Sequence, residues 1–164
     1  MKKHALGVDI GNVIIDFRQI DKDDKEFLEN RYSTIPAAED VFDALKVLNE
    51  HLNGRVYLIS KATDWGQKKI IAWLADNDFH IKTGIDPKNV IFVGERHEKA
   101  YFIEKLGLTH FVDDRLEVLS HMVGLVPHLF LFGPDEGEVE GFKEFLSGVF
   151  VVGGWKDLLA RINP

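Results

Sequence analysis

Five polar side chains stand where apolar segments end or helical segments begin, and together they are the residue types that phosphoryl transfer requires. They are Asp9, Ser60, Lys99 and the pair Asp113-Asp114. A carboxylate can attack phosphorus as a nucleophile, a hydroxyl and an ammonium group can bind phosphate oxygens, and further carboxylates can hold Mg²⁺. Because each residue type is common, the order and placement of the whole set carry the prediction.

Buried strands and amphipathic helices are expected to alternate along the chain and to position these residues. Strand-like apolar runs occupy the first half of 5–15 and then 55–60, 90–93, 109–112 and 127–132, with an edge strand expected at 149–152. Helices are expected at 41–52, 64–74, 98–106, 116–122, 139–146 and 155–162, and Asp64 is expected to be the N-cap of the second. Nearly all-apolar strands that alternate with helices predict an α/β fold with a mostly parallel sheet of five or six strands. The carboxyl ends of such strands line one crevice, where the polar set would meet.

The composition favours one globular domain over 1–164 and excludes several classes of partner. Apolar residues make up 45% of the chain, enough for a core. A net charge of −7 argues against nucleic acids and acidic membranes as partners, because their binders carry a basic face. The absence of cysteine excludes disulfides and thiolate metal sites. Asp9 interrupts the first apolar run and no run is long enough to span a membrane, so a cytoplasmic protein is expected.

Each member of the set also has an ordinary structural explanation. Asp9, Ser60 or the pair Asp113-Asp114 could cap a following helix, and Lys99 could be a solvated lysine at a helix start. A single site for phosphoryl transfer would explain every member of the set. Carboxylates that converge on one crevice repel one another unless a cation lies between them, and a hard, oxygen-liganded Mg²⁺ is the cation such a site favours.

The set resembles the four motifs of the haloacid dehalogenase superfamily. The motifs correspond here to Asp9-Ile10-Gly11-Asn12-Val13, Ser60, Lys99 and Asp113-Asp114. The resemblance covers roughly 5–132 and implies a Rossmann-like three-layer α/β/α fold. It further implies a sheet with the strand order five-four-one-two-three, in which the first strand is central.

The resemblance also implies a role for each matching residue. Asp9 would be the nucleophile that forms an aspartyl-phosphate, and it would bind Mg²⁺ together with Asp114 and the main-chain carbonyl of Gly11. Asp113 would hold Lys99 or a metal-bound water. The residues that would bind the phosphorylated substrate are Gly11, Asn12, Ser60, Lys61 and Lys99.

Two features depart from the family pattern. The family usually has a second aspartate two residues after the nucleophile, where it acts as a general acid, and this chain has Gly11 there. In addition, residues 84–95 imitate the fourth motif, with Glu95 as its acid and Lys82 as the preceding lysine. Asp113 and Asp114 are preferred because two adjacent carboxylates supply both a metal ligand and a partner for it.

The segments that would select a substrate are short. A polar insertion at about 16–36 is the only candidate cap, so the site is expected to be open, as in a phosphatase with a minimal cap. Residues expected near its mouth are Arg18, Lys22 and Tyr32 in the insertion and Lys61, Trp65, Arg96, His97 and Arg115 beside the motifs.

Two functions from different classes follow from this pattern. The first is a Mg²⁺-dependent phosphomonoester hydrolase that works through an aspartyl-phosphate. The alternative is a catalytically degenerate domain that binds a phosphorylated ligand or a protein partner, and Gly11 motivates it. A receiver-type domain with Asp9 as phosphoacceptor is disfavoured because Asp113-Asp114 come so late in the chain.

Overall fold

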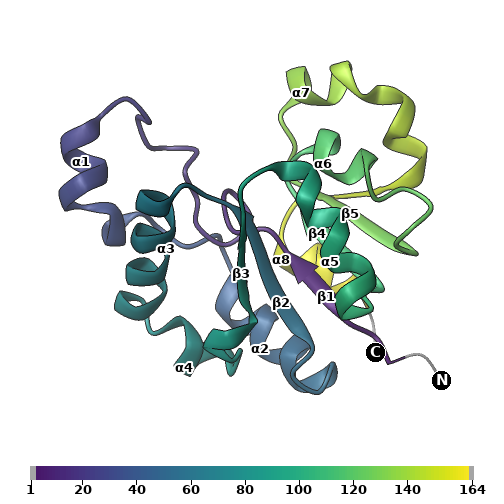
Figure 1. The fold of residues 1–164 in the computed structure, drawn as a ribbon, viewed down its shortest axis with the longest axis horizontal. Helices are drawn as coiled ribbons and strands as arrows, with labels where there is room; N and C mark the ends of the chain where they lie inside the picture. The colour runs from purple at the N-terminus through teal and green to yellow at the C-terminus, as the bar shows by residue number, and fades with distance from the viewer. Residues whose placement is uncertain (1–2, 163–164) are drawn as a thin grey trace.

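The chain forms one parallel six-stranded sheet with helices on both faces (Figure 1). The computed structural model describes residues 3–162. Its strands are β1 (Leu6–Val8), β2 (Val56–Lys61), β3 (Val90–Val93), β4 (His110–Asp113), β5 (His128–Phe132) and β6 (Phe150–Val152). Its α-helices are α1 (Lys25–Asn30), α2 (Val41–His51), α3 (Asp64–Asp76), α4 (Phe79–Thr83), α5 (Lys99–Leu106), α6 (Leu116–Ser120), α7 (Glu136–Gly141) and α8 (Trp155–Arg161). Within this part of the chain, no helix is both long enough and apolar enough to span a membrane.

The sheet order confirms the predicted fold class. The strands follow the order β3-β2-β1-β4-β5-β6, and every neighbouring pair is parallel. The first strand is therefore central, and β6 adds the expected edge strand. Parallel strands need crossover helices, which cover both faces of the sheet and leave the carboxyl ends of the strands free for ligands.

Alternate residues of the central strands supply two separate cores. Val56, Leu58 and Val112 pack into one core with α2, α3, α4 and α8, and Ile59 and Phe111 pack into the other with α5 and α6. This alternation follows from the two-residue repeat of a strand and explains why the runs are apolar at almost every position.

Gly7 shows how closely the central strand packs. A Cβ at this position would lie 2.5 Å from Cδ2 of Phe111 on β4, so only glycine leaves room for the ring. Strand β1 is thereby packed against a large aromatic side chain of its neighbour.

Three local expectations were wrong. Thr63 rather than Asp64 is the N-cap of α3, because its hydroxyl accepts a hydrogen bond from the backbone N–H of Gly66 at 3.2 Å. The expected helix at 139–146 is divided into α7 and a 3₁₀ helix at Lys143–Gly148. Helix α4 was not expected, since its five residues are too few to show a helical repeat.

Candidate active site

The register of the sheet brings Asp9 and Asp113 side by side. Val8 of β1 is paired with Val112 of β4, so Asp9 and Asp113 come next on adjacent parallel strands. The backbone N–H of Asp9 donates to the carbonyl of Val112 at 3.0 Å, which extends the ladder by one residue. Two carboxylates thus lie next to each other at the carboxyl edge of the sheet, although the sequence separates them widely.

Lys99 lies between these two carboxylates. Its Nζ donates to Oδ1 of Asp9 at 2.7 Å and to Oδ2 of Asp113 at 2.9 Å, and its side chain is buried. Helix α5 connects β3 to β4 and therefore crosses the sheet, so its first residue reaches the central strands. Burial alone would lower the pKa of Lys99, but attraction to the two carboxylates outweighs it and raises that pKa above its usual value.

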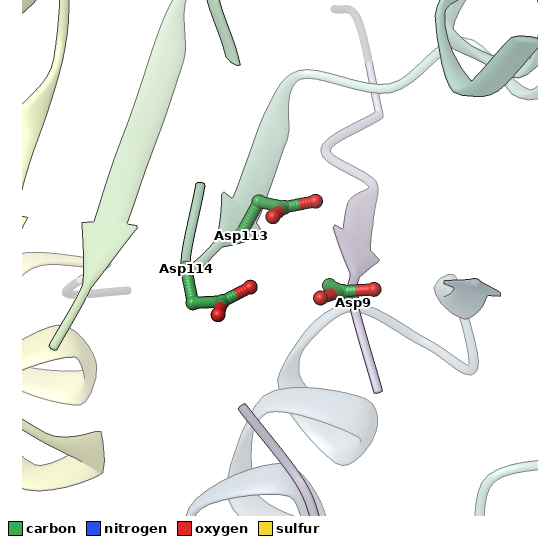
Figure 2. A group of neighbouring side chains, drawn as sticks. All are labelled: Asp9, Asp113 and Asp114. Atoms are coloured by element: carbon green, nitrogen blue, oxygen red, sulfur yellow. The ribbon is translucent and has the colours of Figure 1, made fainter. Parts of the chain in front are cut away.

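Asp114 completes a group of three carboxylates (Figure 2). One oxygen from each of Asp9, Asp113 and Asp114 lies within 4.8 Å of the others. Burial and then repulsion by the other two carboxylates raise the pKa of Asp114, while a 3.4 Å hydrogen bond from the amide of Asn12 opposes that shift. The cluster therefore carries more negative charge than Lys99 alone balances.

These residues fit a hard divalent cation. The donors are carboxylate oxygens, which Mg²⁺ prefers, and three of them converge within 4.8 Å of one another. Among residues 3–162, no hydrogen bond reaches the main-chain carbonyl of Gly11, and Gly11 lines the same pocket as the carboxylates. Asp9, Asp114 and this carbonyl, the ligands that the resemblance implies, therefore all line one pocket, with Asp113 beside them.

A pocket of about 420 Å³ opens over the cluster. Every residue predicted for the site lines it: Asp9, Gly11, Asn12, Ser60, Lys61, Lys99, Asp113 and Asp114. Ser60 is buried near the end of β2, and the only hydrogen bond that its hydroxyl makes in the described part of the chain is a long one of 3.5 Å to the carbonyl of Lys61. The hydroxyl of Ser60 is therefore available to a ligand.

The residues that imitate the fourth motif lie elsewhere. The Nζ of Lys82 lies 4.6 Å from the ring centre of Phe42, in a separate pocket. Glu95 has a side chain that is 63% exposed and pairs with Lys61 at 3.8 Å. Neither residue belongs to the carboxylate cluster or lines its pocket.

The mouth of the pocket contains most of the residues expected there. Lys22 and Tyr32 of the insertion line it, as do four residues beside the motifs, namely Lys61, Trp65, Arg96 and Arg115. Arg18 and His97 are not among its lining residues, and the guanidinium of Arg18 instead binds Asp16 at 2.8 and 3.0 Å.

Three apolar lining residues were missed: Phe17, Leu28 and Val118. Phe17 stands two residues after the apolar run of the first motif, and this closeness was the only sign in the sequence that it could line the site. Leu28 and Val118 are spaced like ordinary core residues of α1 and α6, and nothing in the sequence separates a lining residue from a core residue there.

Comparison with known proteins agrees with this fold. No family profile and no curated protein matches the sequence. A protein from Burkholderia xenovorans LB400, described as a haloacid dehalogenase-like hydrolase, is similar in structure over 97% of both chains, with a TM-score of 0.62 and 15% identity. A D,D-heptose 1.7-bisphosphate phosphatase from B. bronchiseptica, complexed with magnesium and phosphate, is similar over 97% of both chains, with a TM-score of 0.57 and 12% identity. These similarities confirm the fold that the motifs implied. The chain has the fold of the haloacid dehalogenase-like hydrolases.

Proposed function

We propose that the protein is a Mg²⁺-dependent phosphomonoester hydrolase that works through an aspartyl-phosphate on Asp9. The observation that carries this proposal is the arrangement around that carboxylate, which Lys99 binds at 2.7 Å and which lies beside Asp113 and Asp114 in one pocket. Displacement at phosphorus needs a nucleophile, a fixed cation and hard oxygen ligands at one point. The similar phosphatase, complexed with magnesium and phosphate, supports the same activity here.

Asp9 would act in both steps of the reaction. One of its carboxylate oxygens forms a bond to phosphorus while the bond from phosphorus to the ester oxygen breaks, and the leaving oxygen keeps the electron pair and takes a proton from water. Water then attacks the phosphorus of the aspartyl-phosphate, so that Asp9 returns as a carboxylate and inorganic phosphate is released. Asp9 is only 7% exposed, and it lines the pocket through which a substrate would reach it.

The neighbouring residues would bind the phosphoryl group and hold the nucleophile. Lys99 fixes the carboxylate of Asp9, and Asp113 fixes Lys99 from the other side. The hydroxyl of Ser60 would donate to a phosphate oxygen, and Lys61 and Asn12 line the same pocket. When held by Asp9, Asp114 and Gly11, Mg²⁺ supplies Lewis-acid stabilisation of the charge on the phosphate oxygens.

Gly11 determines which esters this site would hydrolyse well. A side-chain acid two residues after the nucleophile would protonate the leaving oxygen, and Gly11 has none. Good leaving groups, such as aryl and acyl oxygens, depend little on this proton. The same observation favours the second candidate function, a domain that binds a phosphorylated ligand without turnover.

A screen of phosphorylated metabolites and aryl phosphates, with and without Mg²⁺, tests the proposal. We expect inorganic phosphate to be released only with the metal, and not by Asp9→Asn. Binding of a phosphorylated compound without release of phosphate would favour the second candidate. Release that persists in Asp9→Asn would contradict both the nucleophile and the proposed intermediate.

A further inference from the structure

We infer that the site selects phosphate esters whose leaving group carries a planar aromatic ring, with Trp65 as the surface on which that ring stacks. This inference deepens the proposed function and rests on it for the position of the phosphate. The phosphate would lie at Asp9 and Lys99, and the ring would lie further out in the same pocket, toward the insertion.

Trp65 stands out as an exposed aromatic side chain inside a lined pocket. It is 43% exposed, whereas the other two tryptophans, Trp73 and Trp155, are at most 1% exposed. Trp65 lines the pocket above the carboxylates together with Phe17 and Tyr32. Because Trp65 is both exposed and part of the pocket lining, its ring is available to a ligand in that pocket.

The three aromatic side chains form a continuous wall. Tyr32 packs edge-on against Trp65, with ring centres 6.2 Å apart, and edge-on against Phe17, with ring centres 5.8 Å apart. Burial raises the pKa of Tyr32 to about 12, so its phenol stays neutral at physiological pH. Aromatic rings thus line this side of the pocket, with the ammonium of Lys69 5.6 Å from the ring centre of Trp65, whereas carboxylates line the pocket at Asp9.

Hydrogen bonds hold Trp65 and the insertion in place. The indole N–H of Trp65 donates to Oε2 of Glu29 at 2.8 Å, and the ammonium of Lys69 donates to the carbonyl of Glu29. Further along α3, Asp76 accepts from the hydroxyl of Ser33 at 2.6 Å. Because these bonds join the insertion to α3, the wall is formed before a ligand arrives, and stacking on it requires little ordering of side chains.

The size of the pocket agrees with a substrate larger than phosphate. A volume of about 420 Å³ lies in the range of sites that bind drug-sized molecules, so a bound phosphate would leave most of it for the leaving group. Stacking on aromatic side chains accepts any planar ring and does not read its hydrogen-bonding groups. The inference therefore specifies a planar ring and no particular substituent.

The test compares two leaving groups of similar size, of which only one contains a planar aromatic ring. Benzyl and cyclohexylmethyl phosphate both release a primary alcohol, so the missing acid at Gly11 affects both alike, and only benzyl can stack. The corresponding phosphonates, which cannot be hydrolysed, give the same comparison by calorimetric titration with Mg²⁺ present. We expect the benzyl compound to bind about five- to a hundredfold more tightly, with kcat/KM changing in the same ratio.

Substitutions of Trp65 test whether this side chain provides the preference for the benzyl compound. We expect Trp65→Leu to remove it and Trp65→Phe to retain part of it, since phenylalanine keeps an aromatic face without the bond to Glu29. Tyr101→Leu is the matched control, because Tyr101 is 65% exposed on α5 and is not among the residues that line the pocket. Thermal melting checks that each variant folds.

The outcomes separate this inference from the proposed function. Equal affinity of the wild type for the two phosphonates would overturn the inference even if both phosphates were hydrolysed. Tighter binding of benzylphosphonate without turnover of either ester would support the inference and contradict the hydrolase. A benzyl preference that survives in a folded Trp65→Leu variant would show that another surface provides it.

Discussion

The ammonium group of Lys99 lies 2.7 Å from Oδ1 of Asp9, although the two residues are 90 positions apart in the sequence. The same ammonium binds Asp113, so one buried cation joins α5, β1 and β4. A buried ammonium that loses its carboxylates, or buried carboxylates that lose their ammonium, would be strongly unfavourable. The site and the stability of the fold are therefore coupled through Lys99.

Replacing Lys99 tests this coupling. We expect Lys99→Met to lower the free energy of unfolding by about 3–5 kcal/mol in the absence of divalent metal, because it leaves buried carboxylates without a counter-charge. Urea denaturation measures the loss, and Mg²⁺ should restore part of it. Lys61→Met is the control, since its exposed 3.8 Å pair with Glu95 contributes at most about 1 kcal/mol. Equal effects of the two substitutions would contradict the coupling.

Asp9→Asn tests the nucleophile. We expect the variant to fold and to lose turnover, because an amide neither attacks phosphorus nor supplies a full negative charge for a metal. Phosphate release and thermal melting are the measurements. Asp64→Asn makes the same chemical change at an exposed position of α3 and should leave the rate unchanged. A rate for Asp9→Asn above a few per cent of the wild type would rule out Asp9 as the nucleophile.

Mg²⁺ should raise the melting temperature of the protein. An ion that binds only the folded carboxylate cluster stabilises the folded state by mass action. We expect Asp114→Ala to abolish the increase and Glu95→Ala to leave it intact, as shown by melting curves with and without the metal. If the two variants behaved in the opposite way, the ligand would be Glu95 after all.

Gly11→Asp should restore the missing acid. Gly11 does not have a positive φ, and the nearest atom to an added Cβ is Cε2 of Phe17 at 3.9 Å, so the backbone and the available space both allow a side chain. A positioned acid typically contributes about 10²- to 10⁴-fold, and only alkyl leaving groups depend on it. We therefore expect a selective increase in the rate on alkyl phosphates. Equal changes on aryl and alkyl phosphates in a folded variant would disprove the assigned role of this position.

His110 should make the stability of the fold depend on pH. Burial, followed by the nearby His128 and His4, lowers the pKa of His110 to about 4. A depressed pKa gives stability that is complete above the unfolded value of about 6.5 and is lost as the pH falls toward 4. We expect this loss to reach about 3 kcal/mol, at about 1.4 kcal/mol per pH unit.

His110→Phe should remove that part of the acid sensitivity. The ring of His110 stacks on His128 with ring centres 4.5 Å apart, and a phenyl ring can occupy the same place. The measurement is the difference in the free energy of unfolding between pH 7.5 and pH 4.5, for the wild type and the variant. Carboxylate titration contributes to both proteins and cancels in the comparison. An identical difference in the two would show that His110 is not responsible.

Local patterns in the sequence were sufficient to predict the fold class and to name a set of polar residues that the structure brings together in one pocket. A strand buried on both faces needs apolar residues at nearly every position, so segments such as β5, with four consecutive buried residues, can be recognised without knowledge of their partners. A polar residue directly after such a strand must lie at the edge of the sheet, as Asp9 and Asp113 do. The order of these residues along the chain was therefore informative before their distances were known.

Only the tertiary structure decided which lysine reaches the carboxylates and what surrounds the pocket. Lys82 and Lys99 both precede acidic residues in the sequence, but the crossover of α5 carries only Lys99 to Asp9. The attachment of the insertion to α3, through pairs such as Trp65 and Glu29, has no counterpart in local sequence pattern. The physical reason is that burial and strand formation depend on neighbours in the chain, whereas these contacts depend on sheet order and register, which distant segments determine together.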